Sequence, residues 1–154
     1  GVLSRVSGLF SRRSFNIDSL AVGVTDDPTV SRITIIVDGN EYTVEQVEKQ
    51  LNKLIDVIKL KTLSPADTIS RELMLVKVAA GANERGEIMN IVRIMEAKIC
   101  DISRTTMTLE ASDTTERLET MLELLRPYGL REVIRTGTIA TQKGSDSITV
   151  KNNN

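Results

Sequence analysis

The first 24 residues change from helical to extended periodicity with no linker between the two patterns. Apolar side chains recur at helical spacing between Val2 and Phe10, and from Ile17 to Val24 apolar residues alternate with small or polar ones. The sequence therefore predicts an amphipathic helix that leads directly into a β-strand. This order constrains the fold more strongly than any other feature of the chain.

Two positions around this helix suit a small charged ligand. A glycine at a helix N-terminus, here Gly1, leaves backbone N–H groups free beside the positive end of the helix dipole, where a carboxylate or a phosphate is stabilised. Asn16, at the start of the following strand, can both accept and donate a hydrogen bond. Together these positions suit a small zwitterion such as an amino acid.

The rest of the first half continues the same pattern of helices and strands. Residues 31–37 alternate as a strand with one apolar face, and a capping-box pattern predicts a second helix that begins at Thr43. Residues 56–63 are predicted to form a further strand. The order is helix, strand, strand, helix, strand, which becomes βαββαβ once a first strand is added before Gly1.

The second half repeats this order after a polar, proline-containing linker at residues 64–68. The predicted elements are a central strand at 72–80 with both faces buried, a helix at 86–97, a hairpin of 99–103 and 107–111, a helix capped at 113–116, and a strand at 130–136. We therefore predict an α+β fold of two ferredoxin-like βαββαβ domains in tandem, the first without its first strand. The predicted boundaries are residues 1–63, residues 70–137 and a polar tail at 138–154.

The composition argues against several classes of protein. There is no histidine and only one cysteine, so a zinc site or a Ser-His or Cys-His nucleophile pair is not expected. A net charge of −1 disfavours nucleic-acid binding, and no apolar run approaches the ~18 residues of a membrane span. Cys100 is predicted to be a buried structural thiol, and Asp26 and Asp27 before Pro28 to be turn residues rather than metal ligands. Among a sensing subunit, an enzyme and a nucleic-acid-binding module, only the sensing subunit needs none of the missing features.

Several dense segments resemble the regulatory (small) subunit of acetolactate synthase, also called acetohydroxyacid synthase, which has an N-terminal ACT domain that binds amino acids. The segments are GVLSRV at 1–6, GLF at 8–10, RSFNI at 13–17, SL at 19–20, TDDPTVSR at 25–32, EKQL at 48–51, KL at 53–54 and RELMLVK at 71–77. The resemblance ends near residues 135–137 and so covers nearly the whole chain. The family's ACT domain begins with a strand, and we expect about ten or more residues before Gly1 to supply it.

The resemblance implies an effector site on the first domain. The implied effector-binding residues are Gly1, Val2, Leu3, Asn16, Ile17, Ala21 and Gly23. Residues 1–3 match the loop whose backbone N–H groups hold the effector carboxylate, and Asn16 and Ile17 match residues that contact the effector from the neighbouring ACT domain. Ala21 and Gly23 match strand positions associated with inhibitor sensitivity.

The resemblance also implies partners and a reaction. Acetolactate synthase joins two pyruvates, or pyruvate and 2-oxobutyrate, and its thiamine diphosphate, Mg and FAD sit on the large subunit, so no cofactor, metal or catalytic residue is expected in this chain. The implied partners are a second copy through the ACT domains, the catalytic large subunit and an amino-acid effector, typically valine, in the bacterial cytoplasm. The alternative is a stand-alone ACT protein that acts on another partner.

Overall fold

The computed structural model describes residues 1–13 and 16–148, and the chain forms two compact units. The first unit comprises residues 1–69 together with the chain from Ala140 onward, and the second comprises Ser70–Ile139. Each unit packs two helices of eight or more residues against antiparallel strands. The predicted α+β class, with two βαββαβ-like units, is confirmed.

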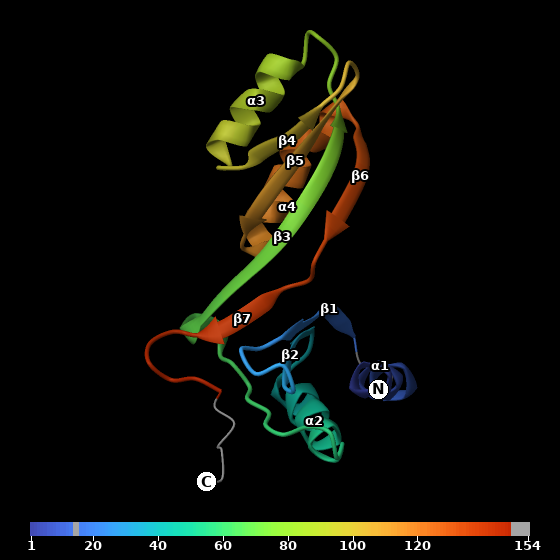
Figure 1. Cartoon of the computed structure of the whole chain (residues 1–154), viewed down its shortest axis with the longest axis vertical. Helices are drawn as coiled ribbons and strands as arrows, with labels where there is room; N and C mark the ends of the chain where they lie inside the picture. The colour runs from blue at the N-terminus through green and yellow to red at the C-terminus, as the bar shows by residue number, and fades with distance from the viewer. Residues whose placement is uncertain (14–15, 149–154) are drawn as a thin grey trace. The chain divides into compact units, whose positions relative to one another are not determined.

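The first unit follows the predicted helix-to-strand order. It contains α1 (Val2–Arg13), β1 (Ile17–Val24), β2 (Ser31–Val37) and α2 (Glu41–Asn52). The two strands are antiparallel, from Ile17 opposite Val37 to Val24 opposite Ser31. Figure 1 shows α1 and α2 next to these strands.

A small apolar core holds the first unit together. Its buried side chains are Val6 and Phe10 from α1 and Val47 and Leu51 from α2. The apolar face of β2 packs against this core through Ile33, Ile35 and Val37, as the alternation predicts. Because few side chains are fully buried, the stability of this unit depends strongly on each of them.

The strand predicted at residues 56–63 is wrong, because this segment forms neither a strand nor a helix. A strand needs a hydrogen-bonded neighbour, and none of the described strands pairs with residues 57–63. Side chains hold the segment instead: Arg5 pairs with Asp56, Thr62 donates a hydrogen bond to Glu48, and Leu60 packs on the first core.

The start of the second helix also differs from the sequence-based prediction. The helix begins at Glu41 rather than Thr43, and its N-cap is Asn40. The Asn40 side chain accepts a hydrogen bond of 2.9 Å from the backbone N–H of Thr43. This bond satisfies one of the N–H groups that the first turn of a helix leaves unpaired, so Thr43 lies inside the helix.

The second unit is a sheet with two helices over one face. After η1 (Pro65–Asp67), its elements are β3 (Thr68–Ala79), α3 (Arg85–Ile94), β4 (Lys98–Ile102), β5 (Thr106–Asp113), α4 (Thr115–Leu125), η2 (Arg126–Tyr128) and β6 (Leu130–Arg135). The last strand, β7 (Ile139–Gln142), begins at the final residue of this unit and belongs mostly to the first unit. The strand order is β4-β5-β3-β6, and β7 also pairs with β3. The predicted apolar stripe of α4 is confirmed, since Leu118, Met121, Leu122 and Leu125 are all buried. Gly129 ends this segment with φ +107°, a conformation that favours glycine.

The prediction that both faces of the long strand are buried is wrong. The long strand is central, but only one of its faces is buried: Met74, Val76 and Val78 are inaccessible, whereas Leu73 and Lys77 are exposed. Both helices lie on the same side of an antiparallel sheet, so the other face stays open.

Cys100 is exposed rather than buried. It lies in β4 at a register shift between Ile99 and Asp101. Ile99 packs against the second core, while the Cys100 Sγ lies 4.0 Å from an Oε1 of Glu110. Because adjacent residues of a strand point to opposite faces, packing of Ile99 on the core places the Cys100 thiol on the other side.

The segment expected to be a polar tail at 138–154 begins with structure. Ile139–Gln142 forms β7, and Gln142 and Lys143 contact Asp67 within the first unit. The backbone N–H of Lys143 donates to the Asp67 carbonyl at 2.8 Å, and the Gln142 amide donates to the Asp67 carboxylate at 3.0 Å. The polar composition of this segment predicted a tail, because a strand of four residues with a polar end is too short to give a clear alternation pattern.

The turn at residues 25–30 has the predicted geometry. An Asp27 carboxylate oxygen accepts hydrogen bonds from the Thr29 hydroxyl at 2.7 Å and from the Thr29 backbone N–H at 2.9 Å. These two bonds lower the pKa of Asp27 below its ordinary value, since they favour the charged carboxylate. Across the described residues, no group of three or more metal-ligating side chains occurs, and no helix is long and apolar enough to cross a membrane.

Candidate functional site

The predicted ligand loop lies at the N-terminus of α1. The Gly1 carbonyl accepts a hydrogen bond of 3.2 Å from the Arg5 backbone N–H, so the first turn of the helix starts at this glycine. Val2 and Leu3 are 36% and 45% exposed, and the first turn contains no acidic residue. The N–H groups of a first helical turn have no partner within the helix, and no acidic side chain of this turn compensates the dipole, so the turn suits a carboxylate.

Asn16 lies after the other end of α1, where β1 begins. Its carbonyl accepts a hydrogen bond of 3.2 Å from the backbone N–H of Asp38, and its side-chain Nδ2 lies 3.4 Å from Asp38 Oδ2. Both side chains are exposed. Ile17 has a structural position, because it pairs with Val37 and packs against the first core.

Ala21 and Gly23 lie two residues apart on β1, with side-chain directions on the same face of the strand. Their partners on β2 are Thr34 and Arg32. Ala21 is 8% exposed, whereas a Cβ added to Gly23 would meet no atom within 4 Å. A side chain larger than glycine therefore fits at position 23 without a steric clash, while space at position 21 is restricted.

The structure does not bring all these positions together within one chain. A helix of 12 residues such as α1 is about 18 Å long. Gly1 and Asn16 flank the two ends of that helix, so one small amino acid cannot contact both in the same copy. The implied residues at the ends of α1 therefore lie in two separate places, which we call the donor half-site (residues 1–3) and the acceptor half-site (Asn16 with its hydrogen-bond partner Asp38).

Two residues of this region were missed by the sequence reasoning. Asp38 is the partner of Asn16, and Arg32, opposite Gly23, donates a hydrogen bond of 2.8 Å to the Ala140 carbonyl. A signal for Asp38 existed in the sequence. If Ile17 and Val37 pair as the first and last residues of an antiparallel hairpin, the residues just outside them must be neighbours.

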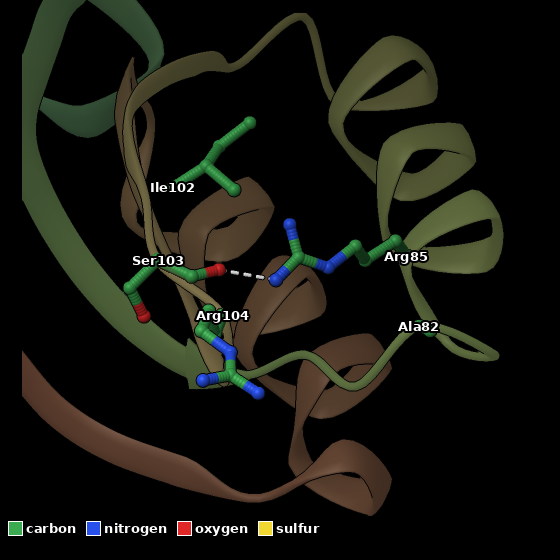
Figure 2. Close-up of a pocket in the computed structure, with 5 residues that line it drawn as sticks. All are labelled: Ala82, Arg85, Ile102, Ser103 and Arg104. Carbon is green, nitrogen blue, oxygen red and sulfur yellow. Dashed lines mark hydrogen bonds between the residues drawn. The ribbon is translucent and has the colours of Figure 1, made fainter.

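An open cavity of about 710 Å³ lies in the second unit, and none of its lining residues is an implied effector residue. It is lined by Ala82, Arg85, Ile102, Ser103 and Arg104. Figure 2 shows the Arg85 guanidinium, from the start of α3, donating to the Ser103 carbonyl of the β4–β5 turn. The lining carries two guanidinium groups and no carboxylate, so its charge suits an anion rather than a cation.

Comparison with known proteins assigns the two units to one class. Residues 1–59 match the family model described as the acetohydroxyacid synthase small subunit-like ACT domain, and residues 71–144 match the small subunit of acetolactate synthase. The fold and these matches define a two-unit regulatory subunit with an ACT domain.

Individual relatives identify the family. The chain is 48% identical over 148 residues to the acetolactate synthase small subunit of Mycolicibacterium smegmatis, covering 96% of this chain and 87% of that protein. It is 42% identical over 146 residues to the acetolactate synthase small subunit of Bacillus subtilis, covering 94% and 85%. The crystal structure of the acetolactate synthase small subunit from Thermotoga maritima matches with a TM-score of 0.86 at 36% identity, covering 95% of this chain and 91% of that one. The chain belongs to the family of acetolactate synthase small subunits, and membership implies a catalytic large-subunit partner.

Proposed function

We propose that this chain senses a branched-chain amino acid, valine foremost, and controls the catalytic large subunit of acetolactate synthase. Two copies associate through their ACT domains, so that the donor half-site of one copy faces the acceptor half-site of the other. The observation that carries this proposal is the separation of the half-sites by the length of α1. A site of this kind is complete only in a dimer, which couples ligand binding to the arrangement of the two copies.

The chemistry of the half-sites fits the two charged groups of an amino acid. The free N–H groups at the start of α1 suit the α-carboxylate, and the acceptor half-site suits the α-ammonium group. In the proposed complex, the large subunit binds thiamine diphosphate, Mg and FAD and performs the reaction in the bacterial cytoplasm. This chain raises its activity and confers feedback inhibition.

Calorimetry tests the binding directly. The purified chain is titrated with valine, leucine and isoleucine, and light scattering follows its mass at micromolar concentration. We expect saturable binding of at least one of them to a dimer. A monomer that binds none would contradict the proposal, and a dimer that binds valine without affecting the large subunit would indicate a stand-alone sensor.

The change Asn16→Ala should weaken amino-acid feedback. Removing a side chain that hydrogen-bonds a charged ligand costs about 1.5–3 kcal/mol, which is a roughly tenfold to hundredfold loss of affinity. The measurement is the valine concentration that half-inhibits the enzyme reconstituted from both subunits, with activation by this chain as a second readout. Asn52→Ala is the matched control, because Asn52 is an exposed asparagine at the end of α2. Equal valine inhibition in the wild type and Asn16→Ala would remove this residue from the site.

The chain alone should not form acetolactate from pyruvate, even when thiamine diphosphate, magnesium and FAD are supplied. The sequence lacks histidine, and the described residues hold no cluster of metal-ligating side chains that could bind a diphosphate-bound cation. The measurement is acetolactate production by the purified chain, with the reconstituted enzyme as the positive control. Turnover by material shown by mass spectrometry to lack a large subunit would overturn the regulatory role.

A further inference from the structure

The cavity of the second unit lies between two segments that are far apart in the sequence. One side is formed by the start of α3 and the loop before it, and the other by the end of β4 and the turn that follows. The Arg85 guanidinium from α3 donates a hydrogen bond to the Ser103 carbonyl of that turn (Figure 2). This bond ties the two sides of the cavity together.

The turn between β4 and β5 is closed by its own hydrogen bonds. The Ser103 hydroxyl accepts bonds from the backbone N–H groups of Thr105 at 3.3 Å and Thr106 at 3.0 Å. The Thr105 carbonyl accepts a bond of 2.8 Å from the Ala80 N–H, just after β3. Arg104 lies within this turn, so its backbone is held in place while its side chain is exposed.

Neither guanidinium group of the cavity is paired with a carboxylate in the described part of the chain. In the same unit, Arg117, Arg126 and Arg135 each form an ion pair. The residues whose structure is not described include no aspartate or glutamate, and the cavity lining holds none either. The cavity is therefore a local excess of positive charge, which attracts an anionic partner.

The exposure of the cavity favours a protein over a small free anion. Ser103 and Arg104 are exposed, and Ile102 is 52% exposed. A small anion in so open a cavity stays largely hydrated, and salt screens its attraction to exposed guanidinium groups. A protein surface that covers the cavity excludes water, which strengthens the charge-assisted hydrogen bonds and buries the Ile102 side chain.

We propose that this cavity is a docking site for a carboxylate side chain of the catalytic large subunit, with Arg85 and Arg104 as its charged partners and Ile102 as the adjoining apolar contact. The inference rests on the proposed function, because membership of the family implies that partner and the cavity supplies a surface for it. A guanidinium group binds a carboxylate through two parallel hydrogen bonds, which gives the contact a defined geometry. No lining residue belongs to the donor or acceptor half-site, so docking and effector binding are separable.

Reversing one charge of the cavity tests the docking site. The purified large subunit is immobilised and titrated with the full-length chain as the wild type, Arg104→Glu and Arg85→Ala. Arg104→Glu should raise the dissociation constant about tenfold or more, because it removes a charge-assisted hydrogen bond and brings a like charge to the carboxylate. Arg85→Ala should also weaken binding, and added salt should weaken the wild type more than Arg104→Glu.

Arg131→Glu is the matched control. Arg131 is an exposed arginine of β6 in the same unit, it is absent from the cavity lining, and its replacement makes the same change in net charge. This control should bind the large subunit as the wild type does. Calorimetry with valine should give one affinity for all the proteins, and thermal melting confirms that each variant is folded.

The outcomes distinguish the docking site from the regulatory role. If the wild type neither binds nor activates the large subunit, both the proposed function and the docking site fail. If the wild type activates it and Arg104→Glu binds equally tightly, the docking site is wrong while the regulatory role stands. If Arg131→Glu weakens binding as much as Arg104→Glu, net charge is the cause and the docking site is again wrong. Saturable binding of inorganic phosphate that Arg104→Glu abolishes, with unchanged affinity for the large subunit, would assign the cavity to a small anion instead.

Discussion

Replacing Arg135 by alanine should destabilise the second unit by about 3–5 kcal/mol, because it leaves a buried carboxylate without its partner. Glu72 on β3 is only 6% exposed. Arg135 on β6 binds both of its oxygens, with Nε to Oε1 at 3.0 Å and Nη2 to Oε2 at 3.1 Å. A second carboxylate, that of Glu119 on α4, lies 2.5 Å from Arg135 Nη1, so the guanidinium joins two strands and a helix.

Urea unfolding of the full-length chain measures this loss. Arg126→Ala is the control, since Arg126 pairs at 3.2 Å with the exposed Glu123 and should contribute about 0–1 kcal/mol. Replacing both Glu72 and Arg135 by methionine should recover most of the lost stability, because no unpaired charge is then buried. A loss below about 1 kcal/mol for Arg135→Ala would show that Glu72 finds water or another partner.

The change Phe10→Ala should destabilise the first unit by about 3–5 kcal/mol and abolish effector binding. Phe10 is 4% exposed and is one of the four fully packed side chains of that core. Its loss leaves a cavity between α1 and α2, and a small domain has little stability in reserve. Because α1 carries the donor half-site at residues 1–3, unfolding of the helix should also remove the proposed contacts with the effector carboxylate.

Hydrogen exchange on the full-length chain locates this effect. Amides of α1 should lose protection, while those of β3 in the second unit should keep it, because the two cores have no buried side chain in common. Tyr42→Ala is the control, since Tyr42 is 69% exposed and its truncation leaves the core intact. Equal loss of protection in β3 would show that the two units unfold as one.

The sequence and the structure agree best in the second unit. The alternation and the helical stripes predict its strands, its helices and the buried face of α4, and each is found within a few residues of the prediction. These features depend on the spacing of apolar residues within one element, and burial of that face is the dominant stabilising contribution. The matches that place the chain in its family are likewise a property of the sequence.

At the implied effector positions, periodicity and resemblance predict the local structure but not the distance between the residues. The resemblance names Gly1 and Asn16, and the periodicity correctly assigns Gly1 to the start of a helix and Asn16 to the start of a strand. It does not show that the two lie at opposite ends of α1 in one copy. That separation follows from the length of the helix, and it is the reason that the proposed site requires a second copy.

By itself, then, the sequence determined the family, the order of the helices and strands, and the faces that become buried. The tertiary structure decided the absence of a strand at residues 56–63, the exposure of Cys100 and the contact between Asn16 and Asp38. The physical reason is the range of the interactions. Apolar periodicity is a local property of one element, whereas a strand needs a neighbour to pair with, and two polar residues 22 positions apart meet only through strand pairing.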